Sequence, residues 1–394
     1  MGKIERNFVL LWSSLFCVFV SGSIFNSIIS LYFSYRGLSY LEIGALVSIG
    51  SLSMILLPVY LGRISDLWSK KKISFVCNLF SAILTPLYVF SKSFISFVPL
   101  HLTVPALYWT YESICSALAV DIAKKGKVGT NLGILRTSAL GWSIGSLFSG
   151  FIIQNFGFET AFVVISIFYF CSAVLVSQLT EAKPDRLHLE EPSLVLKDRH
   201  IIYFLLIVVV AFSTMPAFHS FLPLYMKNEL RAPESVIPLI FAITPLGEIP
   251  LTLLLGRLVD RIDRRKIILI CFSAFPIRWM AIIYSGNYVL VILVQMLHGL
   301  AFAGLYVAAI AYLSDMVTSR ARGMIVGAFS SSISLGTTIG GYALGFTAQN
   351  FGFKTMYLQA IATSTVALLS FATLGLGLRK SINRTAETTV NDGV

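Results

Sequence analysis

Two stretches of the chain decide the fold: Gly-Arg-Ile-Ser-Asp-Leu-Trp-Ser-Lys-Lys-Lys at residues 62–72 and Gly-Arg-Leu-Val-Asp-Arg-Ile-Asp-Arg-Arg-Lys at residues 256–266. A second echo, Gln-Asn-Phe-Gly-Phe, occurs at 154–158 and again at 349–353. Self-similarity at one spacing indicates a duplicated unit. Each basic stretch follows the second of six apolar segments, so we expect two halves of the same design and the same orientation.

Apolar segments of span length make up most of the remaining sequence. The 394 residues are 56% hydrophobic and only 12% charged, whereas soluble domains are about 25% charged. A helix needs about 20 apolar residues to cross a bilayer, and breaks at Gly, Pro and charged residues predict twelve such helices. The expected spans are 8–33, 41–61, 73–91, 96–120, 129–153, 158–180, 200–226, 236–255, 267–285, 288–314, 323–346 and 355–378.

The distribution of charge orients these spans. The formal net charge is +11, and 23 of the 30 Lys and Arg residues fall in the alternate segments that include both termini, against 5 in the segments between them. Basic residues concentrate on the cytoplasmic side, which predicts a multi-pass protein of the cell membrane with both termini cytoplasmic. A nucleic-acid partner is rejected. The five cysteines are scattered among the spans, so no disulfide framework, metal site or cofactor is expected.

The resulting fold class is an all-α membrane protein, with twelve transmembrane helices in two six-helix bundles related by a pseudo-two-fold axis along the membrane normal. We expect an N-terminal bundle at 1–180, a cytoplasmic linker at 181–199, a C-terminal bundle at 200–380 and a cytoplasmic tail at 381–394. Transporters with such a duplication bind their solute between the halves, near the bilayer midplane. Six glycines in spans five and eleven predict close helix packing. They are Gly141, Gly145, Gly150, Gly336, Gly340 and Gly345.

The duplicated loop, written G-x-x-x-D-x-x-x-[RK]-[RK], and the twelve spans resemble the major facilitator superfamily over nearly the whole chain. In that family the loop is a cytoplasmic gate whose Asp bonds a neighbouring helix end. The gate residues that the resemblance implies are Gly62, Asp66, Lys70, Lys71, Gly256, Asp260, Arg264 and Arg265. Ser69 and Asp263 replace glycines that are usual in the motif, which predicts a weaker gate. Part of the basic run also serves to anchor the topology.

Three ionisable residues, Glu248, Arg278 and His298, interrupt separate apolar spans of the C-terminal half. A charge near the bilayer centre costs roughly 3 kcal/mol or more, so such residues mark functional positions. Counting about 1.5 Å of rise per residue places all three in one layer near the midplane. A carboxylate, a fixed positive charge and an imidazole suit proton coupling. The alternative is a static ion-pair network that holds the helices together.

The N-terminal half has a comparable pair, Glu112 in span four and Arg136 in span five. A guanidinium fork and a carboxylate can grip a polyhydroxy solute from two sides. Trp142 and Trp109 lie near them and could supply an aromatic face, although a lone Trp is more often part of the core or of the interface belt.

Three further polar residues are weaker candidates. Gln295, one turn before His298, could line the same wall. His219 and His101 are balanced between a site role and ordinary buried histidines.

The placement of these residues is similar to the lactose-permease-like branch of oligosaccharide–proton symporters and to its phenylpropionate-permease relatives. The stretches Gly133-x-x-Arg136 with Gly141-Trp142, and Gln295-Met-Leu-His-Gly299, carry the similarity. It implies that Glu112 and Arg136 bind the solute, and that Glu248, Arg278 and His298 couple the proton. Ala301 occupies the position of that branch's proton-carrying acid. Glu248 then carries the proton instead, or coupling is altered or lost.

The function expected is therefore secondary active transport of a small organic solute, sugar-like or aryl-acid-like, by proton-coupled symport and alternating access. A proton-coupled drug antiporter is the alternative within the fold, and a non-transporting membrane sensor is the alternative of another class. No H-E-x-x-H, G-x-S-x-G or P-loop pattern occurs, so an enzyme is not expected. The expected partners are the solute, protons and membrane lipid, and the expected state is a monomer.

Overall fold

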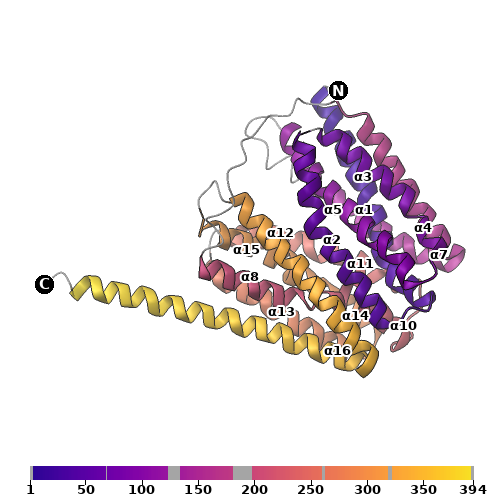
Figure 1. The fold of residues 1–394 in the computed structure, drawn as a ribbon. Coiled ribbons are helices and arrows are strands. Elements are labelled where there is room, and N and C mark those ends of the chain that lie inside the picture. The colour runs from indigo at the N-terminus through magenta and orange to yellow at the C-terminus, as the bar shows by residue number, and fades with distance from the viewer. Residues whose placement is uncertain are drawn as a thin grey trace.

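The computed structural model is helical throughout the residues that it describes (Figure 1). These residues are 3–67, 69–122, 134–180, 198–259, 262–317 and 322–391. The N-terminal half contributes α1 (Lys3–Tyr35), α2 (Tyr40–Leu67), α3 (Lys70–Leu84), α4 (Leu87–Phe90), α5 (Phe94–Ile122) and α7 (Leu140–Ser177). The C-terminal half contributes α8 (Arg199–Phe212), α9 (Pro216–His219), α10 (Phe221–Asn228), α11 (Leu239–Ala242), α12 (Thr244–Val259), α13 (Arg264–Tyr284), α14 (Tyr288–Val294), α15 (Leu305–Ser314) and α16 (Arg322–Asn391).

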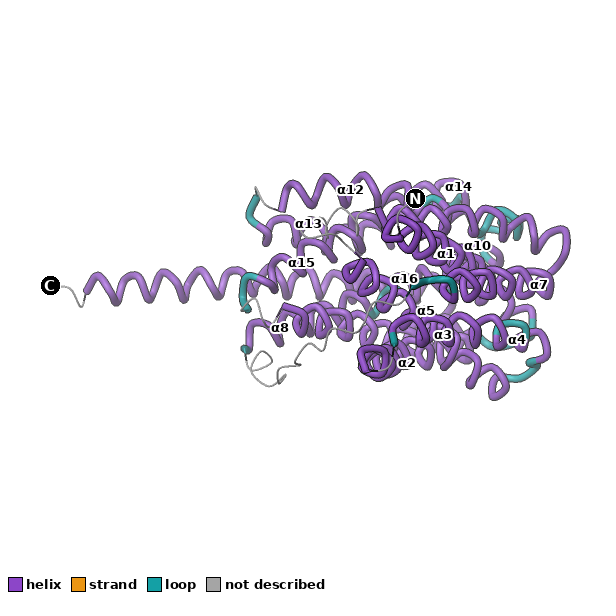
Figure 2. The backbone as a smooth tube through the Cα atoms, turned by 90° about the horizontal axis from the view of Figure 1, so that it is seen from above, coloured by secondary structure: helices purple, strands orange, loops and turns teal. Residues whose placement is uncertain are grey.

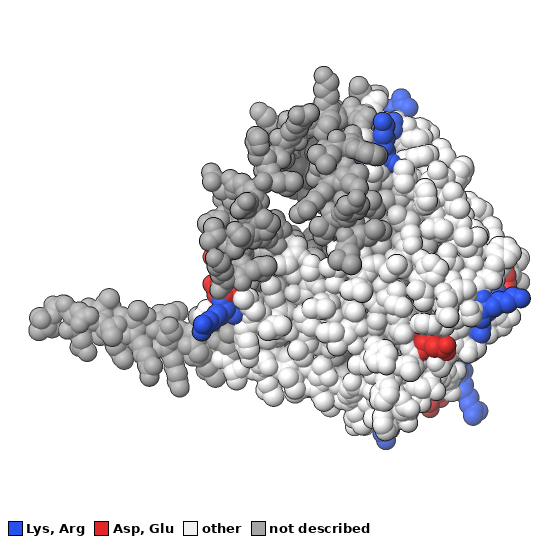
Figure 3. Space-filling view, in the orientation of Figure 1, with Lys and Arg blue, Asp and Glu red and all other residues white. Residues whose placement is uncertain are grey.

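Each predicted span is mainly helical over its described residues. Seven helical stretches of the described chain are long and apolar enough to cross a membrane, and two of them, at 134–177 and 325–373, each cover most of two predicted spans. The helices run beside one another in the view from above (Figure 2). Between the two ends of the bundle the visible surface is almost free of charged side chains (Figure 3). This belt is what a lipid-solvated helical bundle requires.

Two glycines of the repeated Gln-Asn-Phe-Gly-Phe stretches separate the spans within α7 and α16. Gly157 has φ 80° and Gly352 has φ 79°, whereas the residues around them are helical. Glycine adopts positive φ without the steric cost that a Cβ atom brings. The sequence echo is therefore the same backbone turn made twice, once in each half.

Other glycines of the repeat let helices pack closely within each half. A Cβ atom at Gly141 would lie 2.6 Å from the carbonyl oxygen of Phe16, so α7 needs glycine against α1. Gly336 of α16 meets the carbonyl oxygen of Val209 of α8 in the same manner. The predicted packing role of these glycines is confirmed, because a side chain at either position would push two helices apart.

The two halves are in contact at the end of the bundle that carries the connections 36–39 and 229–238, which we name the predicted outer end. One buried apolar cluster runs through the N-terminal half and continues there into the C-terminal half, whereas a second cluster is confined to the C-terminal half. Gly345 of α16 packs against Gly44 of α2, and the Ser48 hydroxyl donates a hydrogen bond of 2.6 Å to the Thr338 carbonyl oxygen. Both contacts join α2 to the first part of α16.

Candidate functional site

The predicted pair in the N-terminal half forms an ion pair. Nη1 of Arg136 lies 3.0 Å from Oε1 of Glu112, which belongs to α5. The Arg136 side chain is 65% exposed and that of Glu112 is 12% exposed, so the guanidinium is the accessible member. Arg136 is also close enough to Glu248 and Tyr306 of the C-terminal half for electrostatic interaction with them. Glu112 therefore holds the guanidinium within electrostatic range of the other half.

Three tryptophans lie near this pair along the chain or contact a residue next to it, and one of them, Trp12, is not indicated by the sequence. Trp109 is 43% exposed and packs edge-on against Tyr108, and Trp142 is half-buried against the main apolar cluster. Trp12 of α1 donates a hydrogen bond of 2.9 Å from Nε1 to the Thr137 hydroxyl, in the 3₁₀ turn that follows Arg136. No motif points to Trp12, because its partner lies 125 residues away.

The acid and the imidazole of the C-terminal half are brought into contact. Nε2 of His298 lies 3.3 Å from Oε1 of Glu248, with side chains that are 4% and 29% exposed. Adjacent glycines make this contact possible: a Cβ atom at Gly247 would lie 2.6 Å from the Met296 carbonyl oxygen, and one at Gly299 would lie 2.8 Å from the Glu248 backbone. The close crossing of α12 over span ten therefore presents Glu248 to His298.

The backbone around His298 is irregular. Span ten runs from α14 through a 3₁₀ turn at Gln295–Leu297 and a π-helical turn at Leu300–Gly304 before α15 begins. His298 and Gly299 lie between the two irregular turns. Such interruptions of an α-helix are frequent at functional sites, because they change the direction in which side chains point.

Arg278 does not pair with Glu248. It is fully buried, and its Nε and Nη2 atoms donate to Oε1 of Gln295 at 3.1 and 2.5 Å. Its guanidinium also lies 4.3 Å from the ring centroid of Phe218 and 4.9 Å from that of Trp279. Arg278 Nη1 has no hydrogen-bond partner among the described residues. The predicted trio is thus a Glu–His contact with the guanidinium held beside it.

Gln295 and Phe218 connect the guanidinium to the rest of the trio. Gln295 is fully buried, accepts from Arg278 and donates from Nε2 to the Val291 carbonyl oxygen at 2.7 Å. This geometry favours a role in positioning Arg278 over the predicted direct contact with the solute. The Phe218 ring lies 4.8 Å from the His298 ring, so one aromatic side chain touches both basic residues.

The comparisons with known proteins agree with this architecture. The sequence profile of the MFS_1 like family, a family of the major facilitator superfamily, matches residues 8–359. The chain belongs to this family.

Individual MFS transporters are similar to it over most of their length. Sugar efflux transporter A of Escherichia coli strain K12 is 23% identical over 90% of this chain and 92% of that protein. Multidrug resistance protein 2 of Bacillus subtilis strain 168 is 24% identical over 84% of this chain and 86% of that protein. Among solved structures, a mutant form of the nucleoside transporter NupG has a TM-score of 0.83 at 16% identity, covering 95% of this chain and 100% of that one.

The protein is therefore a membrane transporter and not an enzyme, and it shares the twelve-helix, two-bundle fold of the superfamily. Its substrate is a small molecule, as is that of the relatives. The predictions of fold class and family are confirmed.

The gate motif of this MFS transporter is described in part. Gly62 and Gly256 lie in the helical backbones of α2 and α12, and Lys70 and Lys71 begin α3. The side chain of Asp66 and the whole of Asp260 lie outside the part of the chain that the structure describes.

In the second copy Arg264 forms an ion pair with Asp315 at the end of α15, and it donates to the Ala311 carbonyl oxygen at 2.8 Å. The backbone N–H of Arg265 donates a hydrogen bond of 3.0 Å to the Asp263 side chain. Arg264 therefore ties the start of span nine to the end of span ten.

Ser69 and Asp263, which depart from the motif, have a structural role. Each is the N-cap of the helix that follows: the Ser69 hydroxyl accepts from the Lys72 backbone N–H at 3.1 Å, and Asp263 accepts from that of Arg265. Side-chain oxygens at this position satisfy otherwise unpaired backbone donors. The two replacements start α3 and α13 at equivalent places in the repeat.

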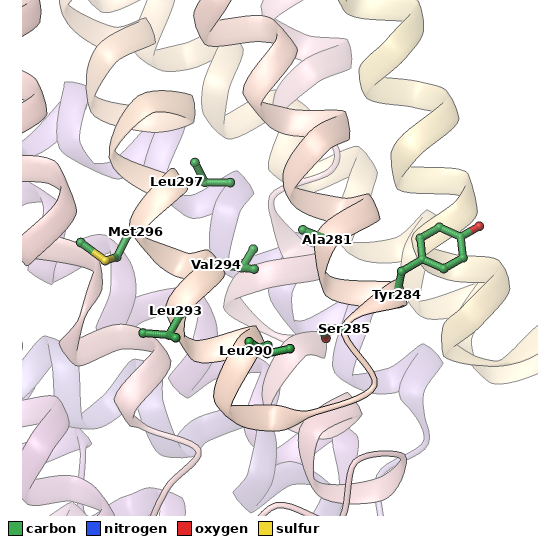
Figure 4. Close-up of a pocket in the computed structure, with 8 residues that line it drawn as sticks. All are labelled: Ala281, Tyr284, Ser285, Leu290, Leu293, Val294, Met296 and Leu297. Carbon is green, nitrogen blue, oxygen red and sulfur yellow. The ribbon is translucent and has the colours of Figure 1, made fainter.

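A hollow of about 580 Å³ lies between the end of α13 and α14, apart from the charged residues (Figure 4). Apart from Ser285 and the hydroxyl of Tyr284 its lining is apolar, and Tyr284, Leu290, Leu293 and Met296 are all exposed. A surface of this composition within a membrane-spanning bundle faces acyl chains. It lacks the polar groups that would orient a solute.

Proposed function

We propose that this MFS transporter moves a small organic solute, sugar-like or aryl-acid-like, in symport with protons by alternating access. The contact between Glu248 and His298 carries the proposal, because it joins a partly exposed carboxyl to a nearly buried imidazole in the middle of two spans. Ionisable groups so placed are costly and are retained for transport of charge or solute. Glu248 takes the proton, and His298 is its hydrogen-bonding partner.

The solute site proposed is the Arg136–Glu112 pair with the surface around it. The pair offers a planar donor fork and an acceptor, which together match neighbouring hydroxyl groups or a carboxylate. Trp109, exposed one helical turn from Glu112, supplies an aromatic surface for a sugar ring or an aryl group. Because the charge of Arg136 acts on Glu248, solute bound there also influences the proton-carrying half.

The two halves, 1–180 and 200–380, act in this proposal as bodies that rock about the solute, with the linker 181–199 between them. Both termini and the basic gate loops face the cytoplasm, since 23 basic residues fall on that side and 5 on the other. The protein works as a monomer in the cell membrane, because each chain contains both halves that alternating access requires.

Export is a second candidate for the direction of transport. It is favoured by similarity to a sugar efflux transporter and to a multidrug resistance protein. Both directions use the same pair of sites, because a proton gradient can drive symport or antiport through one titrating carboxyl. Direction is read from the sign of solute accumulation in vesicles of known gradient.

The test uses purified protein in proteoliposomes with labelled galactosides, nucleosides and aryl acids. Wild type should accumulate its solute when a pH gradient is imposed, and Glu248→Gln should lose this accumulation while retaining exchange of labelled for unlabelled solute. The matched control is Glu159→Gln, an exposed glutamate beyond the turn in α7, which should behave as wild type. Full gradient-driven uptake by Glu248→Gln would remove Glu248 as the proton carrier.

A further inference from the structure

His219 lies beside the Glu248–His298 pair, on an element that no motif singles out. It ends α9, a four-residue helix (Pro216–His219) between two breaks in span seven. Its ring centroid is 6.1 Å from that of His298, with the ring planes at 90°. The backbone break before Pro216 therefore brings a second imidazole to the site.

His298 is bonded on one side only. Its Nε2 contacts Glu248, whereas its Nδ1 is buried and has no hydrogen-bond partner among the described residues. Buried polar atoms are nearly always paired with protein or water. An imidazole with a carboxyl on one nitrogen and a free second nitrogen can receive a proton at one edge and release one at the other.

His219 brings a second imidazole within reach of His298. His219 is partly exposed, whereas His298 is 3% exposed. At their centroid separation one water molecule, or rotation of one ring, is enough to connect the two imidazoles. The His219 ring is itself held by Phe218 at 4.7 Å and by Phe241, which stacks nearly parallel to it at 6.3 Å.

Among the residues that the structure describes, Arg278 and His298 are the charged or titratable groups that interact with His219. Glu248 contacts His298, and Tyr357 interacts with Arg278. A fixed guanidinium nearby repels a second positive charge. A proton arriving at His219 would therefore be passed on to water and not stored there.

We propose that His219 is a further proton-carrying residue, which connects the buried imidazole of His298, and through it Glu248, to water at the partly exposed ring of His219. This inference rests on the proposed proton coupling. In one transfer, protonated Glu248 gives its proton to Nε2 of neutral His298 while Nδ1 of His298 gives its proton, through one water, to His219. Glu248 becomes a carboxylate, and His219 becomes an imidazolium that releases its proton to solvent. A flip of the His298 ring then turns the protonated Nε2 toward His219 and the unprotonated Nδ1 toward Glu248, so that the next proton follows the same route.

The test compares His219→Asn with two matched controls, His200→Asn at the exposed start of α8 and His101→Asn. His101 is buried and its Nδ1 lies 3.2 Å from the Tyr88 hydroxyl. In proteoliposomes His219→Asn should lower gradient-driven uptake and solute-dependent proton flux by about 100-fold or more, the range of a positioned proton-transfer group. Solute exchange, which needs no net proton movement, should stay within about twofold of wild type. His200→Asn should leave all three rates unchanged, and any loss in His101→Asn should affect the three rates equally.

Rescue by external imidazole distinguishes proton transfer by His219 from a purely structural role. In His219→Ala, external imidazole should restore proton flux. The restored flux should change with pH as the ratio of neutral to charged imidazole in solution changes. Undiminished gradient-driven uptake by His219→Asn, or equal loss of exchange and gradient-driven uptake without imidazole rescue, would overturn the inference. If Glu248→Gln keeps full gradient-driven uptake, the proposed proton coupling through Glu248 is wrong. If only His219→Asn keeps full gradient-driven uptake, proton coupling through Glu248 stands and proton transfer through His219 is wrong.

Discussion

Substitution of Gly345 by alanine tests the contact between the halves. A Cβ atom at this position of α16 would lie 2.8 Å from the Tyr40 carbonyl oxygen and 3.0 Å from the Gly44 Cα atom, both in the backbone of the other half. The helices would have to separate by roughly half an ångström to regain ordinary van der Waals contact. Overpacking of this kind costs about 1–3 kcal/mol.

The cost applies to one conformation of the transporter. When the predicted outer end opens, α2 and α16 separate and the added methyl group meets no backbone. A differential free energy of about 1–3 kcal/mol changes the ratio of two conformations by about 5- to 150-fold. Gly345→Ala should therefore increase the population that is open at the predicted outer end.

The assay measures distances between spin labels in a cysteine-free background. Lys92 and Lys354 are exposed at the predicted outer end, one in each half, and serve as labelling sites. The matched control is Gly327→Ala in the same helix, where a Cβ atom would meet nothing within 4 Å and the gain in helix propensity is the same. A distance distribution that Gly345→Ala leaves unchanged, or that Gly327→Ala shifts equally, would refute the packing argument.

Two further predictions concern the ion pairs. Arg136→Lys should weaken solute binding by about tenfold or more, measured by titration, because a point charge cannot replace a donor fork facing Glu112; unchanged affinity would remove Arg136 from the solute site. Asp315→Asn removes the carboxylate that pairs with Arg264. The free energy of unfolding should change by at most about 1 kcal/mol, because exposed ion pairs contribute little, whereas the transport rate should differ from that of wild type. Identical rates for Asp315→Asn and wild type would show that this pair does not act in gating.

A shared layer could be predicted from residue counting, whereas partners could not. Counting the rise per residue placed Glu248 and His298 in one layer, and the structure has them in contact. The same count placed Arg278 in that layer, where its guanidinium bonds to Gln295 and lies over Phe218 instead of pairing with Glu248. Residue counting gives the height of a residue along its helix but not the direction of its side chain, and the 3₁₀ and π turns of span ten change that direction.

Residues outside motifs show the same limit. The break in span seven that precedes Pro216 places His219 next to His298, and a hydrogen bond across 125 residues ties Trp12 to the start of span five. Neither position carries a repeated pattern. Conversely, Ser69 and Asp263 look like defects of a motif in the sequence, and become N-caps once the helix starts are known.

The sequence by itself determined that the protein is solvated by lipid, that it is helical and duplicated, and that Glu248 and His298 share one layer. These properties follow from composition, from apolar segment length and from repeats, all of which are read along one dimension. Only the tertiary structure decided which ionisable groups meet, because pairing depends on how each helix is rotated about its own axis and on how closely its glycines let a neighbour approach. The crossing at Gly247 and Gly299 is one example, since this close approach of two helices brings Glu248 to His298.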